Sequence, residues 1–301
     1  MKCATIIIAV TLAASQLVSG EDDLKSAALA MLGSQAKNYG KVKVEYALQV
    51  IVPTEKKQST VEFWYDPALG TFRHSERLQD MVVIRSWDGK ESLHWQRHIN
   101  EKKPGFGLVG NEPEDAGTLV RLKKPALFKM DVKDIFELAS KPAVRYIFEN
   151  ATFTKVASEP TGIPGGFLIR CASHYGEADI HFPTGWIVSL TDKSIKDRTR
   201  VTKLSEFKKV GDVDRWFPTR VTRSDLGGSA AAEPLATREV TVKSVLMGAA
   251  ADPAPMILPP GTGIQDNVKG TLESVRGQGP GAGQVEERLK HLIDQAKQKT
   301  K

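Results

Sequence analysis

The chain has 301 residues, of which 41% are hydrophobic and 26% are charged, a composition typical of a globular protein. Lysine and arginine together number 42 and aspartate and glutamate 36, which gives a net charge of +6. This basic excess is small and spread along the sequence, with no dense basic tract interleaved with aromatic residues, so nucleic acid is not an expected partner.

Residues 1–20 have the features of a secretory signal peptide. Lys2 supplies a positive start, an apolar run extends from Ile6 to Ala14, and small residues at 18–20 precede an acidic stretch. The apolar run is too short for a membrane span. We therefore expect a periplasmic or secreted protein with no stable transmembrane span after cleavage, and an uncleaved anchor is the alternative. Cleavage leaves Cys171 as the only cysteine, so no internal disulfide can form.

The first half predicts a helix followed by strands. Apolar residues recur at helical spacing over residues 22–37, and acidic residues occupy the first turn. Apolar and polar residues alternate over 42–50, as in a half-buried strand. Further strands are predicted at 60–65, 71–78, 81–87 and 91–99. The last two flank Asp88-Gly89, a pair that favours a tight hairpin because both turn positions need positive φ.

The middle of the chain is predicted to contain a loop and a helix, and the second half almost only strands. Residues 100–124 are polar and rich in glycine and proline, which predicts an exposed loop. A short helix is predicted at 132–140, because Asp131 lies near its start and Pro142 just past its end. Short strands separated by turn residues favour a meander; they are predicted at 151–158, 166–173, 178–182, 186–192, 199–210, 215–224 and 236–247.

The C-terminal region is predicted to be a linker followed by a helix. Residues 269–284 are rich in glycine and predict a flexible connection. Residues 285–301 place apolar side chains on one helical stripe and charged side chains on the other, as in an amphipathic helix. This helix either packs on the sheet or frays, or it contacts a partner or a membrane.

These elements together resemble the outer-membrane lipoprotein-sorting proteins, the periplasmic lipoprotein carriers of bacteria. The resemblance rests on the helix that leads into residues 42–50, the hairpin 86–90 followed by Leu93-His94-Trp95, the strands around 217–220 and 238–242, and the ending Leu-Pro-Pro-Gly-Thr-Gly-Ile-Gln-Asp at 258–266. Relative to these carriers the chain is longer and adds a glycine- and proline-rich segment at 104–125 and the C-terminal helix.

The resemblance implies an α+β, mostly β fold. Its main part would be a strongly curved antiparallel sheet, an incomplete barrel around an apolar cavity, with an N-terminal helix, a short lid helix and here an appended C-terminal helix. The implied organisation is a signal peptide at 1–20, a carrier-like β domain at 21–268, a linker at 269–284 and the helix at 285–301.

Two short motifs resemble catalytic or nucleotide-binding signatures. Gly105 to Gly110 match G-x-G-x-x-G, but a dinucleotide site needs a helix directly after it, and none is predicted. We interpret this segment as a flexible loop. Ser-x-x-Lys occurs at 34–37 and 205–208 without the partner motifs of a penicillin-recognising enzyme, so chance explains it.

The histidines and Cys171 are weak candidates for metal binding or catalysis. His94 and His98 would lie on one face of a strand, roughly 13 Å apart, too far for one metal ion. His174 and His181 lie on separate predicted strands and could approach each other, but ordinary polar strand faces are the simpler interpretation. Cys171 lies in an apolar strand, which predicts a buried, unreactive thiol. No cofactor and no metal are expected.

Aromatic residues on the predicted strands are the candidate ligand contacts. They either form ordinary sheet core or line a cavity for acyl chains, in which apolar contact supplies the affinity. The candidate cavity residues are Phe63, Tyr65, Trp87, Trp95, Phe182 and Trp216.

The sequence therefore favours a non-enzymatic protein of the bacterial cell envelope that binds a lipid, an acylated protein or another amphiphile. The alternative is an envelope interaction module that docks a protein partner through the C-terminal helix and the 104–125 loop. A hydrolase whose catalytic residues come from distant strands is the third hypothesis. It ranks last because no activated nucleophile or base is recognisable in the sequence.

Overall fold

The structure is a computed structural model. It describes residues 20–31, 40–66, 68–100, 104–111, 142–156, 163–194, 197–211, 215–227, 234–252, 258–266 and 271–274. The predicted signal peptide up to residue 19, the predicted helix at 132–140 and the predicted C-terminal helix lie outside the described residues. None of the helices in these ranges has the length and apolar composition needed to span a membrane.

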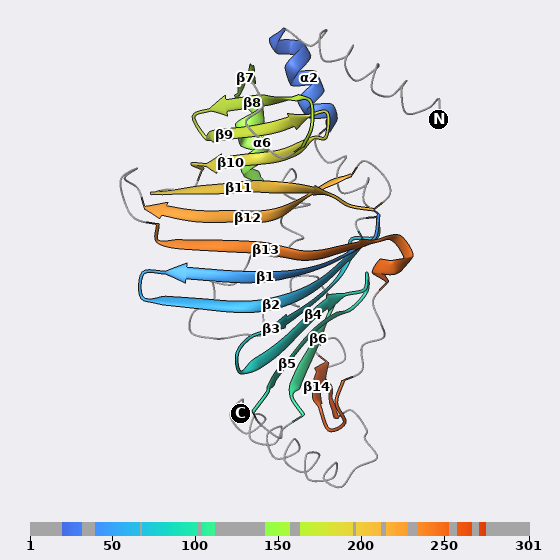
Figure 1. Cartoon of the computed structure of the whole chain (residues 1–301). Coiled ribbons are helices and arrows are strands. Elements are labelled where there is room, and N and C mark those ends of the chain that lie inside the picture. Colours follow the sequence, from blue (N-terminus) through green and yellow to red (C-terminus); the bar gives the residue numbers. More distant parts are fainter. Residues whose placement is uncertain are drawn as a thin grey trace. The chain divides into compact units, whose positions relative to one another are not determined.

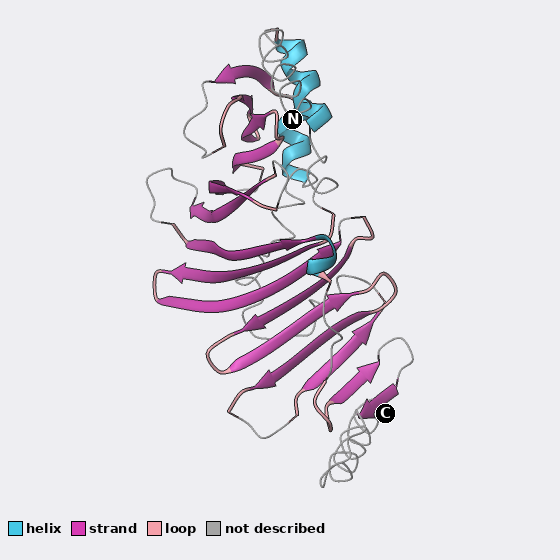
Figure 2. Cartoon of the chain, turned by 45° about the vertical axis from the view of Figure 1, so that its right-hand side comes forward, coloured by secondary structure: helices cyan, strands magenta, loops and turns pink. Residues whose placement is uncertain are grey.

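The chain forms two compact units that alternate along the sequence. The first unit contains Met1–Gly40, Tyr46–Lys57 and Lys129–Met247, and the second contains Lys41–Glu45, Gln58–Phe128 and Gly248–Lys301. Strand β1 (Val42–Val52) and strand β2 (Glu55–Asp66) each contribute residues to both units. Strands dominate both units, with few helices (Figure 2).

The first unit is an antiparallel meander with two helices. Its strands follow in chain order, each hydrogen-bonded to the next (Figure 1). They are β7 (Thr152–Val156), β8 (Phe167–Ser173), β9 (Gly176–Phe182), β10 (Trp186–Asp192), β11 (Arg198–Lys209), β12 (Trp216–Gly227) and β13 (Ala236–Met247). Helix α2 (Glu21–Met31) contacts β7, and α6 (Pro142–Glu149) contacts β8 and β9.

The second unit continues the strand series in the order β2, β3 (Thr71–Arg77), β4 (Met81–Trp87), β5 (Ser92–His98), β6 (Phe106–Gly110), β14 (Gly263–Asp266) and β15 (Thr271–Ser274). All these neighbours are antiparallel except β6 and β14, which are parallel. A short 3-10 helix, η2 (Gly248–Ala251), precedes β14 in the chain.

Alternating side chains produce this strand content. In β1 every second residue from Val42 to Val50 is buried, and in β2 the residues 59, 61, 63 and 65 are buried while their neighbours are more exposed. The largest fully buried side chains of the first unit include Trp186, Phe217 and Ile169, and Phe63 and Val61 are fully buried in the second. Burial of such apolar surface is the main favourable contribution to folding.

The predicted fold class is confirmed: the protein is mostly β, with a curved antiparallel sheet in each unit, an unclosed strand series and few helices. Most predicted strands are found within one or two residues, and β2 begins five residues earlier than predicted. Pro142 is the first residue of helix α6, a position where its missing N–H is not needed. Strand β15 lies within 269–284, the range predicted as a linker.

The predicted loop at 100–124 is wrong for residues 106–110, which form β6 between β5 and β14. The glycines of the G-x-G-x-x-G motif serve close strand packing. A Cβ on Gly105, where φ is +100°, would lie 2.7 Å from the Gln96 carbonyl oxygen, and a Cβ on Gly107 would lie 2.8 Å from Cδ1 of Ile264. The motif is therefore structural and does not form a nucleotide-binding turn.

Candidate functional site

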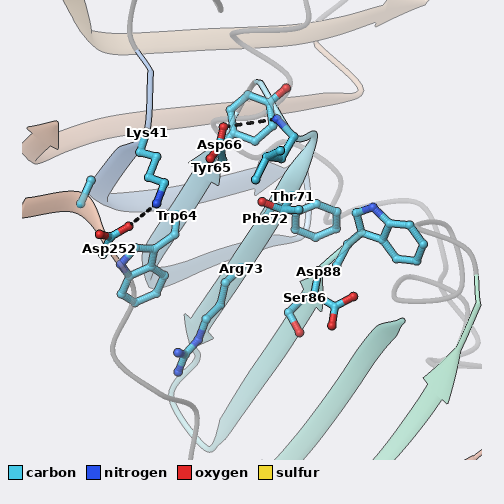
Figure 3. A pocket seen from close by; sticks show the side chains of 13 residues that line it. Lys41, Trp64, Tyr65, Asp66, Thr71, Phe72, Arg73, Ser86, Asp88 and Asp252 are labelled. Atoms are coloured by element: carbon cyan, nitrogen blue, oxygen red, sulfur yellow. Dashed lines mark hydrogen bonds and ion pairs between the residues drawn. The ribbon is translucent and has the colours of Figure 1, made fainter. Parts of the chain in front are cut away.

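The candidate site is a cavity of about 380 Å³ in the second unit. It lies beside the turns that join β2 to β3 and β4 to β5, next to η2 (Figure 3). The lining residues are Lys41, Trp64, Tyr65, Asp66, Leu69, Thr71, Phe72, Arg73, Ser86, Trp87, Asp88, Ala251 and Asp252. Four aromatic rings contribute to the walls, so apolar contact is the main interaction that the cavity offers.

Strand register places the aromatic residues in rows across the sheet. Tyr65 lies opposite Phe72, and Phe72 lies opposite Trp87; we call these three residues the aromatic row. Trp64, Arg73 and Ser86 form the neighbouring row. Successive side chains of a strand point to opposite faces, so the two rows lie on opposite faces of the sheet. The cavity includes residues of both rows at the strand ends.

Charged groups surround the aromatic walls. The Lys41 ammonium donates a hydrogen bond to Asp252 at 2.7 Å, and this interaction raises the pKa of Lys41 (Figure 3). The Arg73 guanidinium lies over the Trp64 ring, 5.1 Å from its centroid, a favourable cation–π arrangement. Burial lowers the pKa of Arg73, with an opposing contribution from Glu62, yet a guanidinium stays charged at neutral pH.

The two carboxylates at the turns have local structural roles. Asp66 accepts hydrogen bonds from the backbone N–H groups of Ala68 and Leu69, at 3.0 and 3.3 Å. Asp88 accepts them from Lys90 and Glu91, both at 2.8 Å, and these bonds lower the pKa of Asp88. Because Oδ1 of each carboxylate is used in its turn, Asp66 and Asp88 help to shape the cavity.

The structure brings together two of the six predicted cavity residues, Tyr65 and Trp87. Phe63 is fully buried in the core, with its ring centroid 6.0 Å from that of Tyr65, and Trp95 is buried but does not line the cavity.

Phe182 and Trp216 belong to the first unit and are both half-buried. There Phe182 stacks on Phe167, and the Trp216 carbonyl accepts a hydrogen bond from the Trp186 indole at 2.7 Å.

The predicted set of cavity residues did not include the other lining residues. Trp64, Phe72 and Arg73 could have been found from the strand register, because the hairpins on either side of β3 place them close to Tyr65 and Trp87. Lys41 and Asp252 are 211 residues apart in the chain, and no local pattern indicates that they meet.

Cys171 is buried, and His181 and His174 contact neighbouring residues of the first unit. Cys171 is fully buried, as predicted, and burial raises the pKa of its thiol to about 12. His181 contacts Thr184 Oγ1 at 3.0 Å and the Gly165 carbonyl at 3.1 Å, while the His174 ring packs on Tyr175. Within the described ranges, no group of three or more His, Cys, Asp or Glu side chains could hold a metal ion.

Stability is expected to fall as the pH decreases from 7 to 5. Burial, together with the charges of Arg85 and His94, holds the pKa of His74 well below its usual 6.5, and burial also lowers the pKa of His181. The unfolded chain takes up protons near pH 6.5 that the folded chain does not, so protonation favours unfolding below that pH. Urea unfolding at a series of pH values measures this dependence.

The replacement His74→Gln is expected to flatten the dependence of the free energy of unfolding on pH. The slope is the readout, so a general loss of stability in the variant does not affect the comparison with the wild type. If the free energy of unfolding depended on pH with the same slope in His74→Gln and in the wild type, His74 could not be a buried group that stays neutral in the folded protein.

Comparisons with known proteins give structural similarity at low identity. No protein-family model matches the chain, and no curated protein matches it. A DUF1329 family protein from Desulfovibrio piger is 10% identical with a TM-score of 0.41, over 77% of this chain and 94% of that chain. An outer membrane lipoprotein-sorting protein domain from Vibrio parahaemolyticus is 10% identical with a TM-score of 0.41, over 74% and 94%.

A LolA superfamily protein from Nitrosomonas europaea is 8% identical with a TM-score of 0.37, over 73% of this chain and 93% of that chain.

Proposed function

We propose that this chain is an exported, non-catalytic protein of the bacterial cell envelope that binds an amphiphile, such as a lipid or an acylated protein, in the cavity of the second unit. The observation that carries the proposal is the cavity of about 380 Å³ with four aromatic rings in its walls. The predicted export signal in residues 1–20 and the resemblance to periplasmic lipoprotein carriers support the location.

The size and chemistry of the cavity fit one acyl chain or a compact amphiphile. Ligand cavities generally measure about 300 to 1,000 Å³, with mostly apolar walls and a few polar groups that orient the ligand. Here Trp64, Phe72 and Trp87 offer apolar contact, and Arg73 and Lys41 offer positive charge beside it. Each methylene group transferred from water into such a cavity contributes about 0.8 kcal/mol.

Binding of a fluorescent fatty acid to residues 21–301, purified without detergent, tests this proposal. Trp87→Ala is expected to weaken binding about tenfold, because roughly 60 Å² of ring surface covered by ligand contributes about 1.5 kcal/mol. Trp216→Ala is the matched control. Both tryptophans are half-buried strand residues, but Trp216 belongs to the first unit and does not line the cavity.

Retained binding in Trp216→Ala with weakened binding in Trp87→Ala would support the cavity as the site. Native mass spectrometry of the wild type supplies an independent readout, since a bound lipid appears as a mass adduct that dissociates on activation. A protein that takes up no amphiphile in either assay would refute the proposed function, and equal losses in the two variants would refute this location.

A further inference from the structure

A buried polar cluster lies on strands β3, β4 and β5 of the second unit, outside the lining of the cavity. Its members are His74, Glu76, Arg85, Ser92 and His94. Ser92 is 1% exposed and His74 is 4% exposed, and the Arg85 side chain is 21% exposed. Burial of so many polar side chains on an otherwise apolar face is unusual unless each of them has a hydrogen-bond partner.

Strand register places this cluster next to the aromatic row. His74 and Arg85 lie directly opposite each other, and Ser92 lies directly opposite Trp87. His74 is two residues beyond Phe72 on β3, and Arg85 is two residues from Trp87 on β4, so all four side chains point to the same face. Two residues along a strand span roughly 7 Å, which is within reach of a ligand that occupies the cavity.

Glu76 is already engaged on the side of the cluster farther from the cavity. Its Oε1 accepts a hydrogen bond from the Ser59 hydroxyl at 2.7 Å, and Arg85 Nη2 lies 3.6 Å from its Oε2. The second distance is longer than a hydrogen bond, so the Glu76 carboxylate attracts the Arg85 guanidinium but does not accept a hydrogen bond from that nitrogen. Glu76 is two residues beyond His74 on β3 and therefore one further step from the aromatic row.

Three polar atoms on the side nearer the cavity lack a hydrogen-bond partner in the part of the chain that the structure describes. They are His74 Nδ1, Arg85 Nε and the Ser92 hydroxyl. The Arg85 Nε–H is a donor only, the Ser92 hydroxyl can donate, and His74 donates from Nδ1 in one tautomer. Buried atoms of this kind are costly to leave unpaired, and together they match an acceptor with several oxygen atoms.

We infer that His74, Arg85 and Ser92 form a headgroup subsite for the carboxylate or phosphate of an acyl amphiphile whose chain lies along the aromatic row. The inference rests on the proposed function and adds to it the chemical class of ligand. Arg85 supplies the positive charge and the planar donor geometry that an oxyanion requires. Ser92 and His74 supply the further hydrogen bonds that fix the headgroup beside Trp87 and Phe72.

The experiment compares three ligands with the same sixteen-carbon chain: palmitate, hexadecyl phosphate and hexadecanol. The wild-type protein is expected to bind at least one of the two acidic ligands about tenfold or more tightly than the alcohol. Ser92→Ala is the cleanest variant, because it removes a buried hydroxyl without a partner and should not weaken the fold. It is expected to lower the preference for the acidic ligand about fivefold, and Arg85→Gln should abolish it.

Ser59→Ala is the matched control. Ser59 is also a buried serine of the second unit, but its hydroxyl is bonded to Glu76, so its removal should lower stability and leave the acid preference unchanged. The relative binding of the phosphate and the carboxylate shows which oxyanion the subsite prefers.

The outcomes separate the subsite from the function. If all three ligands bind equally well and Ser92→Ala changes nothing, the carrier proposal stands and the headgroup subsite is refuted, with water satisfying the three atoms instead. If none of the ligands binds, the proposed function itself fails.

Discussion

Replacement of Trp186 by alanine is expected to lower the free energy of unfolding by about 3–5 kcal/mol. Trp186 is 1% exposed in the core of the first unit, and its ring centroid lies 5.9 Å from those of Phe207 and Phe217. Its indole N–H also donates to the Trp216 carbonyl at 2.7 Å. The variant therefore leaves a cavity in the core and removes this hydrogen bond.

Urea unfolding followed by circular dichroism measures the effect of Trp186→Ala. Trp216→Ala is the control, since the Trp216 side chain is half-buried and its main-chain carbonyl is retained, so a loss of about 1 kcal/mol is expected. A loss below about 1 kcal/mol in Trp186→Ala would contradict the close packing of Trp186 against Phe207 and Phe217.

Replacement of Asp225 by asparagine is expected to cost about 3 kcal/mol, at the lower end of the range for breaking a buried ion pair. Asp225 accepts hydrogen bonds from Arg200 Nε and Arg238 Nη1, both at 2.7 Å, and the Arg238 side chain is only 8% exposed. The variant removes the carboxylate from two guanidinium groups at once. Arg200 is 37% exposed, so water compensates part of its loss.

The exposed pair of Arg220 and Glu206 is the matched control for Asp225→Asn. These side chains lie 3.4 Å apart and are 48% and 58% exposed, so Glu206→Gln is expected to change stability by less than about 1 kcal/mol. Burial raises the pKa of Asp225, but the hydrogen bonds and charges of Arg200 and Arg238 lower it by more, so the pKa lies below its usual value.

The lowered pKa of Asp225 determines how its contribution depends on pH. The stabilisation is present above the unfolded pKa of 3.8 and is lost as the pH falls through the lower folded pKa. Equal costs for Asp225→Asn and Glu206→Gln at neutral pH would show that the buried network contributes no more than a surface pair.

Local patterns predicted most of the fold because most strands pair with a sequence neighbour. The alternation over 42–50 marked β1, and Asp88-Gly89 marked the turn between β4 and β5. Short strands with distant partners were missed. Strand β6 contains two glycines in five residues and pairs in parallel with β14, and Thr262 beside β14 donates a hydrogen bond to the Pro104 carbonyl, 158 residues earlier.

The candidate site was predictable in part for the same reason. Tyr65 and Trp87 were identified because aromatic residues on predicted strands are visible in the sequence, whereas Phe182 and Trp216 carry the same signal and lie in the other unit. Composition alone does not distinguish a ring that lines a cavity from one that fills a core. The buried polar cluster is not visible in the sequence either, because His74, Arg85 and Ser92 look like solvated strand positions until register and burial are known.

The alternation of the two units along the chain has a consequence for biosynthesis. The chain passes from one unit to the other after residues 40, 45, 57, 128 and 247, so neither unit is a contiguous fragment. A ribosome must therefore complete β13 before the first unit has all its strands, and β15 before the second has its own. The few pairings between distant segments, such as β6 with β14, form slowly and leave strand edges unpaired meanwhile. Newly made chains would therefore keep unpaired strand edges, and would depend on chaperones, until the last strands are synthesised.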